Sequence, residues 1–245
     1  MQLYFIRHAQ SANNALWDNT GNNLGRSEDP EITETGCKQA ALLAKALLQG
    51  DPLQGDPAIP ITNGDLQNRR GFRLTHLYTS LMVRAVATGS IVARALELPL
   101  VGWKDVHEGG GIYLDDEISG LPVGQPGKNR SYFAAHYPEL RLPDDLGEEG
   151  WWNRPYEAIE ERSPRAKRFL QELLNRHGGT GDRVGVISHG AFYNRMLGEL
   201  LRMSSREGLW FMLNNCAITR IDFNEDDVSL IYTNRADFLP AEWIT

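Results

Sequence analysis

The stretch Leu3-Tyr4-Phe5-Ile6-Arg7-His8, close to the start of the chain, decides the fold. Its first four residues form an apolar run without polar alternation, which is typical of a strand covered on both faces. The run stops at Arg7 and His8, two polar residues that can carry charge and form hydrogen bonds. A buried strand that ends in this way indicates a sheet edge that supports a functional loop.

Two later segments repeat this arrangement. Residues 74–79 are interpreted as a second strand, which leads toward Arg84, and residues 183–188 as a third, which leads directly into His189. All three runs have the length of a strand rather than that of a buried helix. The same pattern at three separate places predicts three buried strands of one sheet.

Segments with helical spacing separate these strands. We expect a first helix at residues 33–48, where Thr33 caps the start and Gly50 ends the helix, and a second from Ser80 to about residue 96. A third is expected at 156–176, with a new segment starting at Ser163-Pro164, and a fourth after His189-Gly190. A terminal pair of strands, 218–223 and 229–233, is expected around a turn at 224–227. Strands that alternate with helices predict a three-layer α/β/α sandwich with a mainly parallel central sheet.

We interpret residues 1–245 as a single domain with two insertions. A length of 245 residues suits one sizeable α/β core. Residues 50–72 are rich in Pro, Gly, Asp and Asn, and this composition predicts a surface insertion. Residues 109–153 lack clear periodicity, so we expect an elaborated loop region there rather than a separate domain.

Composition and charge narrow the class of protein. Hydrophobic residues make up 41% of the chain and charged residues 23%, as in ordinary soluble globular proteins. The formal net charge is −7 and the basic residues are dispersed, which argues against a nucleic-acid partner because such binding needs a basic surface.

No stretch approaches the ~20 apolar residues of a membrane span, and the first apolar run is too short for a signal peptide. Cys37 and Cys216 have no metal-ligand or redox spacing, so a cytoplasmic protein is expected.

Polar residues follow all three predicted buried strands. Arg7 and His8 follow the first, Arg84 the second and His189 the third. Because ligands of open α/β sheets bind at the carboxyl ends of the strands, we expect these four side chains to converge. Guanidinium groups neutralise phosphoryl oxygens, and a neutral imidazole is a competent nucleophile. The set predicts a site that binds a dianionic phosphoryl group and attacks it.

Transfer of a phosphoryl group to histidine also requires a proton for the leaving alcohol. Glu108, immediately before Gly109-Gly110-Gly111, is our candidate for this acid, and it would later act as the base when water hydrolyses the phosphohistidine. His107 is a second titratable group at the same place, and the sequence does not decide between the two. Each of these residues taken singly has an ordinary structural explanation, whereas their joint occurrence favours the catalytic one.

Six stretches, taken in order over nearly the whole chain, resemble the histidine phosphatase superfamily, which includes phosphoglycerate mutases and fructose-2,6-bisphosphatase-like phosphatases. The stretches are Arg7-His8-Ala9-Gln10-Ser11, Ile32-Thr33-Glu34-Thr35-Gly36-Cys37-Lys38-Gln39-Ala40, Tyr78-Thr79-Ser80-Leu81-Met82-Val83-Arg84-Ala85, Val106-His107-Glu108, Ile187-Ser188-His189-Gly190-Ala191 and Asn215-Cys216-Ala217-Ile218-Thr219. The resemblance implies a phosphoglycerate mutase-like fold and a phosphohistidine intermediate.

The resemblance also implies a role for each matching residue. It implies that His8 is the phospho-acceptor, that Arg7, Arg84, His189 and Gly190 form the phosphate pocket, that Ser11 and Asn14 are auxiliary phosphate contacts, and that Glu108 is the proton donor. No metal or organic cofactor is implied. The expected partner is a small phosphorylated metabolite, neither nucleic acid nor membrane is expected, and a homodimer is left open.

Departures from the family pattern bear on the reaction. Ala9 stands where the family usually has Gly, and we expect its methyl group to alter selectivity. The segment after Glu108 lacks the Arg-His-Tyr-Gly typical of cofactor-dependent mutases, and Ala191-Phe192 replaces the mutase-type Asn-Ser. Both differences favour hydrolysis of a phosphomonoester, hence a phosphatase.

Alternatives to this interpretation remain open. One is a phosphoglycerate mutase-type phosphotransferase, and another is a non-catalytic protein that binds phosphorylated ligands. A third is a serine hydrolase built on Ser188, although such an enzyme needs Gly where Val186 stands. Substrate choice is expected to depend on residues 109–152, where Lys128, Arg130 and Arg141 could close over the ligand as a lid; the alternative is that these loops only pack the edge of the domain.

Overall fold

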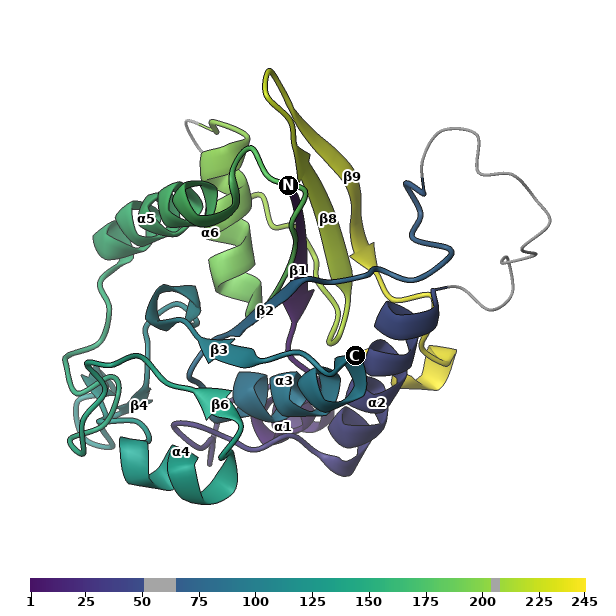
Figure 1. Ribbon diagram of the computed structural model, residues 1–245. Helices are drawn as coiled ribbons and strands as arrows, with labels where there is room; N and C mark the ends of the chain where they lie inside the picture. The colour runs from purple at the N-terminus through teal and green to yellow at the C-terminus, as the bar shows by residue number, and fades with distance from the viewer. Residues whose placement is uncertain (51–64, 204–207) are drawn as a thin grey trace.

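Figure 1 shows a computed structural model of the chain, in which residues 1–50, 65–203 and 208–245 are described. A seven-stranded sheet forms the middle layer, and helices cover both of its faces. The predicted three-layer α/β/α architecture with a mainly parallel sheet is therefore confirmed. Most of the insertion predicted at residues 50–72 lies outside the described residues.

The sheet places the predicted strands side by side. Its order is β6 (Leu140–Arg141), β3 (Leu100–Gly102), β2 (His76–Thr79), β7 (Arg183–Ser188), β1 (Gln2–Arg7), β8 (Ile218–Phe223) and β9 (Val228–Arg235). The first five strands pair in parallel, and β8 and β9 pair antiparallel at the other end. Arg7 lies opposite Ser188, and Thr79 lies opposite Ile187. The carboxyl ends of β1, β2 and β7 therefore meet at one edge of the sheet.

Helices on both faces explain why the first strand lacks polar alternation. Figure 1 shows α2 (Glu34–Gln49) and α3 (Val83–Leu96) on one face of the sheet, with α5 (Ile159–His177) and α6 (Gly190–Leu200) on the other. Residues 3–6 of β1 are completely buried between these layers. The ring centroid of Phe5 lies 6.3 Å from that of Phe192 and 5.2 Å from that of Tyr193, both on α6. Burial of such aromatic side chains is a major part of the stabilisation of a core.

Short elements fill the region predicted as an elaborated loop. A two-stranded hairpin of β4 (Tyr113–Asp115) and β5 (Pro122–Gly124) precedes α4 (Arg130–His136), and β6 follows. Before this region lies the short 3-10 helix η1 (Lys104–Val106), and a second one, η2 (Ala241–Trp243), lies near the end of the chain. The indoles of Trp151 and Trp152 are buried and anchor the loops to the main body.

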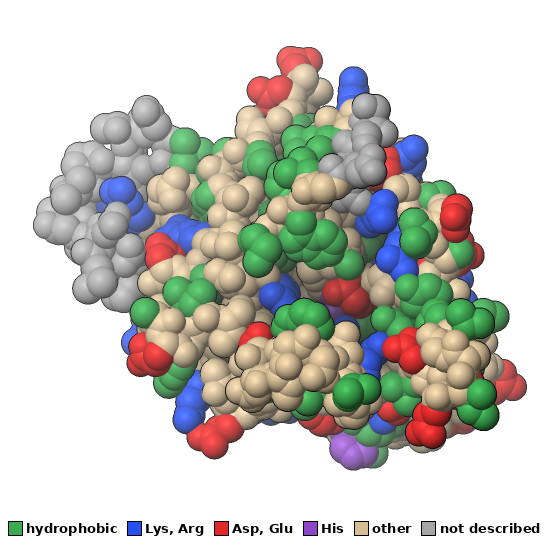
Figure 2. Space-filling model, turned by 180° about the vertical axis from the view of Figure 1, so that it is seen from behind, with side chains coloured by type: hydrophobic (Ala, Val, Ile, Leu, Met, Phe, Trp, Pro, Cys, Tyr) green, Lys and Arg blue, Asp and Glu red, His purple; other side chains and the backbone are tan. Residues whose placement is uncertain are grey.

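The surface carries a mixture of charges. On the face shown in Figure 2, basic and acidic side chains are interspersed among polar and apolar ones. Within the described part of the chain, none of the helices combines the length and the apolarity required to cross a bilayer.

The start of α3 differs from the prediction. Ser80 does not cap the helix, because α3 begins at Val83, and the capping residue Met82 provides no side-chain hydrogen bond. Instead, a carboxylate oxygen of Asp29 accepts a hydrogen bond of 2.9 Å from the backbone N–H of Val83. The cap comes from a residue far away in the sequence, which local pattern reading cannot identify.

The start of α5 and several small elements also differ from the prediction. The helix expected at 156–176 is α5, which begins at Ile159 and runs through Pro164, so the new segment predicted at Ser163-Pro164 is wrong. The side chain of Glu161 accepts a hydrogen bond of 3.1 Å from the N–H of Ala158 and so sets the earlier start. Proline inside a helix removes one backbone hydrogen bond, and the helix nevertheless continues through Pro164. The helix α1 (Ala12–Thr20) and the short strands β3 to β6 had no clear sequence signal.

Gly36, in the family-like stretch at the start of α2, permits a close approach of the β1–α1 loop. A methyl group at this position would lie far inside van der Waals contact with the carbonyl oxygen of Gln10. We therefore predict that Gly36→Ala lowers the free energy of unfolding by roughly 2 kcal/mol or more, the scale of overpacking against rigid backbone. Urea denaturation measures this change. Gly147→Ala is the control, because no atom lies near its added methyl group, and a change within about 0.5 kcal/mol is expected. Equal stability of the two variants would contradict this packing.

Candidate active site

Three strand ends bring two histidines and two arginines to one edge of the sheet. Arg7 ends β1 and His8 follows it, Arg84 lies in the first turn of α3, and His189 is the capping residue of α6. The imidazole centroids of His8 and His189 are 5.0 Å apart. Arg84 donates a hydrogen bond of 3.1 Å from Nε to Nε2 of His8. The side chains that the sequence predicted to converge do so.

Hydrogen bonds determine which nitrogen of His8 carries the lone pair. Nδ1 lies 2.7 Å from the carbonyl oxygen of Ala9, and a carbonyl can only accept, so Nδ1 is protonated. Nε2 therefore accepts from Arg84 with its lone pair. Burial lowers the pKa of His8 well below its usual value, and the positive charges of Arg84 and Arg7 lower it further. The ring is held neutral, with Nε2 directed at the cationic cluster.

Several buried polar atoms around His8 have no partner within the described residues. Both ring nitrogens of His189 and Nε of Arg7 belong to this group, and the His189 ring is completely buried. Burial lowers the pKa of His189 well below its usual value, and the charge of Arg84 acts in the same direction. Unsatisfied buried donors and acceptors cost free energy, and where they cluster they indicate a ligand site. The donors gathered here suit an anion.

Arg84 is oriented by groups on both sides of it. One oxygen of Asp29 lies 3.8 Å from its Nη1, and the hydroxyl of Thr88 donates a 2.7 Å hydrogen bond to its carbonyl. Thr88 also accepts a 3.0 Å hydrogen bond from the N–H of Ala9, which links the arginine to the loop of His8. Burial raises the pKa of Asp29 to about 7, against the opposing charge of Arg84. Asp29 was missed by sequence reasoning, since nothing in its neighbourhood points to a partner in α3.

Glu108 lies at the start of α6, next to His189. Its carboxylate accepts hydrogen bonds from the backbone N–H groups of Gly109 at 2.8 Å, Phe192 at 3.1 Å and Ala191 at 3.3 Å. The carboxylate thus covers donors that a helix N-terminus otherwise leaves free. Its negative charge also favours the protonated forms of Arg7 and Arg84. The predicted acid is at the same edge of the sheet as the histidines and arginines.

The neighbouring His107 points into the interior. Its Nδ1 lies 2.7 Å from the carbonyl oxygen of Glu108, and its ring packs against Trp152 with centroids 4.7 Å apart. Burial lowers the pKa of His107 well below its usual value. The ring is almost completely buried, so its environment is that of a core residue.

Ser11 and Asn14 hold the turn that carries His8. Ser11 caps α1, and its hydroxyl donates a 2.9 Å hydrogen bond to the side-chain oxygen of Asn14. Asn215 donates from Nδ2 to the carbonyl oxygen of His8 at 2.8 Å. These bonds fix the backbone next to the imidazole. The direct phosphate contacts expected of Ser11, Asn14 and Gly190 stay a prediction.

A buried ion pair supports the loop of Glu108, and sequence reasoning missed it. Arg165 binds both carboxylate oxygens of Glu157, at 2.5 Å and 2.8 Å. The same guanidinium donates to the backbone carbonyls of Asp105 at 2.7 Å and His107 at 2.9 Å. Glu157 in turn accepts from the N–H of Gly110 at 3.2 Å. The pair holds the backbone on both sides of Glu108, although its two residues belong to no recognised motif.

The three basic residues expected to form a lid, Lys128, Arg130 and Arg141, lie in different environments. The guanidinium of Arg130 donates to the carbonyls of Leu146 and Pro143, so it braces its own loop. Lys128 lies 5.0 Å from the ring centroid of Tyr132, and Arg141 is exposed on β6. Arg26, which the sequence did not single out, lies 4.3 Å from the ring centroid of Tyr113. The charges of Arg26 and Tyr113 both act on the pKa of Arg84, which places them near the cluster.

Known proteins resemble this chain in sequence. The model of the histidine phosphatase superfamily (branch 1) matches residues 3–55 and 66–235. A probable phosphoglycerate mutase GpmB from Photorhabdus laumondii is 23% identical over 226 residues, which cover 91% of this chain and 85% of the relative.

Solved structures show the same fold. A mutant of phosphoserine phosphatase from Entamoeba histolytica has a TM-score of 0.56 at 19% identity, covering 98% of this chain and 99% of the other. A putative alpha-ribazole-5'-P phosphatase from Escherichia coli has a TM-score of 0.60 at 18% identity, covering 96% and 98%. At such identities the likeness concerns the fold alone.

The buried ion pair leads to a prediction about stability. Arg165→Ala should lower the free energy of unfolding by about 3–5 kcal/mol, because it leaves the carboxylate of Glu157 buried without its partner. Arg168→Ala is the matched control on the same helix. Its side chain is mostly exposed and lies 3.4 Å from Asp105, so a loss below about 1 kcal/mol is expected. Urea denaturation of both variants measures the difference, and similar losses would show that Glu157 does not depend on Arg165.

Proposed function

The chain belongs to the histidine phosphatase superfamily, and from this premise we propose that it hydrolyses a small-molecule phosphomonoester through a phosphohistidine on His8. One observation carries the proposal: the lone pair of His8 Nε2 faces a buried cluster formed by Arg84, Arg7 and His189. A neutral nucleophile beside fixed positive charge suits attack on a dianionic phosphoryl group.

In the first step the phosphoryl group binds among the arginines. Its oxygens accept hydrogen bonds from Arg7, Arg84 and His189. Buried donors of Arg7 and His189 that have no partner in the free protein thereby gain one. Nε2 of His8 then forms a bond to phosphorus while the ester P–O bond breaks. The hydrogen bond from Nδ1 to the carbonyl of Ala9 stabilises the positive charge that develops on the ring. The positive charges of the two arginines neutralise the negative charge on the phosphoryl oxygens during both steps.

Glu108 handles the protons in both steps. In the first step the protonated form of Glu108 gives its proton to the leaving oxygen, so that the products are an alcohol and the ionised carboxylate. In the second, it takes a proton from water as the water oxygen attacks phosphorus and the N–P bond breaks. His8 is restored and inorganic phosphate leaves. The position of Glu108 beside His189 at the start of α6 supports this role.

Hydrolysis is preferred here to transfer onto a second hydroxyl. Gly109-Gly110-Gly111 follows Glu108, and Ala191-Phe192 follows the second His-Gly, so both mutase-type stretches are missing. The relatives named as probable phosphoglycerate mutases favour a mutase-type transferase as the second candidate. Product analysis separates the two, because a mutase gives isomerised substrate and little inorganic phosphate.

A serine hydrolase, another of the alternatives, is disfavoured by the surroundings of Ser188. Its hydroxyl is completely buried and donates a 2.7 Å hydrogen bond to the carbonyl of Val106. A hydroxyl so engaged has no base to activate it. We further propose a cytoplasmic location, which the two free cysteines support.

His8→Ala tests the proposal directly. Removing the nucleophile should lower kcat/KM for p-nitrophenyl phosphate by about a thousandfold or more, the scale seen when a covalent nucleophile is lost. Quenched-flow labelling of the wild type with a phosphorus-32 substrate should trap acid-labile phosphate on residue 8. His76→Ala, at the opposite end of the sheet, is the control and should retain full activity. A wild type without turnover, or His8→Ala with wild-type turnover, would refute the proposal.

Glu108→Gln tests the proton donor. For alkyl phosphates, whose leaving group needs a proton, the rate should fall by about a hundredfold or more. For p-nitrophenyl phosphate, whose leaving group is stable as an anion, the first step should be nearly unaffected. Burst-phase kinetics of the same variant with both substrates measure the contrast. Equal slowing of both first steps would remove Glu108 from this role.

A further inference from the structure

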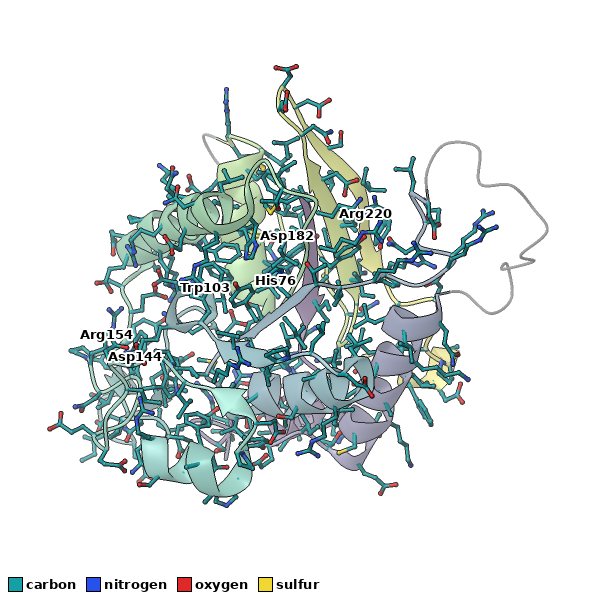
Figure 3. The ribbon with its side chains drawn as sticks, in the orientation of Figure 1. His76, Trp103, Asp144, Arg154, Asp182 and Arg220 are labelled. Carbon is teal, nitrogen blue, oxygen red and sulfur yellow. The ribbon has the colours of Figure 1, made fainter. Side chains whose placement is uncertain are left out.

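We propose that His76, His177 and Asp182 form a binding site for a divalent transition-metal ion of the zinc class. These three residues lie at the edge of the sheet opposite the one that carries His8 and His189. His76 begins β2, His177 ends α5, and Asp182 immediately precedes β7. Figure 3 shows His76 and Asp182 lying close together in this part of the molecule.

The donor atoms are almost in place for one ion. Nδ1 of His177 lies 2.8 Å from Oδ2 of Asp182, and Nδ1 of His76 lies 4.0 Å from Oδ1 of the same carboxylate. One ligand atom from each of the three residues lies within 4.8 Å of the others. Ligands of one zinc ion, at bonds of about 2.0–2.1 Å, are roughly 3–3.5 Å apart. A movement of about 1 Å by the imidazole of His76 would complete the set.

The chemistry of the three residues fits this class of ion. Two imidazoles and one carboxylate are donors that zinc accepts in tetrahedral sites, and the fourth position can hold water. Calcium and magnesium prefer sites made of oxygen atoms.

Tyr78 supplies the support that a metal-binding histidine requires. Its hydroxyl lies 3.0 Å from Nε2 of His177, on the side of the ring away from Asp182. Without an ion, Nδ1 of His177 donates to the carboxylate, and the hydroxyl of Tyr78 donates to Nε2. When an ion replaces the proton on Nδ1, Nε2 becomes the donor and the tyrosine oxygen accepts. Both states leave the buried ring with its hydrogen bond.

Solvent can reach the site from one side. The side chains of His76 and Asp182 are 42% and 27% exposed, whereas that of His177 is 4% exposed. The hydroxyl of Thr75 lies 2.9 Å from Nδ1 of His76, and this hydrogen bond has to break before Nδ1 can bind an ion. The hydroxyl can then donate to the carbonyl oxygen of Arg183, which lies 3.3 Å from it. A bound ion would join the end of α5 to the starts of β2 and β7, so it would stabilise the folded chain.

Isothermal titration of the chelator-treated protein with zinc chloride tests the site. We expect one saturable site per chain in the wild type, and the same site in His8→Ala, which excludes chelation by the phosphohistidine cluster. His76→Ala should weaken binding tenfold or more. His136→Ala, which removes a histidine from α4, should bind as the wild type does. Zinc should raise the unfolding temperature of the wild type and leave that of His76→Ala unchanged.

A second variant keeps the test decisive if His76→Ala is poorly folded without zinc. Asp182→Asn retains an acceptor for His177 but removes the charged ligand, and it should also lose binding. Phosphatase activity toward p-nitrophenyl phosphate should remain in both variants, so this test is independent of the proposed reaction. A wild type without saturable zinc binding would overturn the proposal. Binding of wild-type strength in folded His76→Ala or Asp182→Asn would do the same.

Discussion

Arg7 of β1 lies opposite Ser188 of β7 in a parallel pair, and this register places the site. It brings the residues that follow the two strands, His8 and His189, to the same level with their rings 5.0 Å apart. A shift by one residue would turn every side chain of β1 to the other face of the sheet. Such a shift would also break the close packing of the large, completely buried side chains of residues 3–6 against the helices on both faces.

Burial gives the site its chemical character. Removing His8 from water keeps its ring neutral, and the hydrogen bond to the carbonyl of Ala9 leaves the lone pair on the nitrogen beside Arg84. The same burial leaves polar atoms of His189 and Arg7 without partners in the described part of the chain. Burying polar atoms without partners costs free energy of folding, which the large surrounding core offsets. Such unsatisfied atoms are typical of sites that bind charged ligands.

Imidazoles are used in different ways at the two edges of the sheet. At the carboxyl edge, His8 and His189 are buried next to arginines, so cations are repelled and anions are favoured. At the opposite edge, His76 and His177 lie next to the carboxylate of Asp182, which has the opposite effect. The neighbouring charge, and not the residue type, decides which kind of ligand each pair of histidines suits.

The sequence by itself determined the central strands, the cap of α2 at Thr33 and the convergence of Arg7, His8, Arg84 and His189, because each depends on local spacing and on the rule that parallel strands end together. The tertiary structure alone decided that Asp29 caps α3, that Pro164 is tolerated within α5 and that Arg165 with Glu157 holds the loop of Glu108. It also decided the meeting of His76 with His177. Most of these contacts join residues distant in the sequence, so no local pattern of composition or periodicity records them.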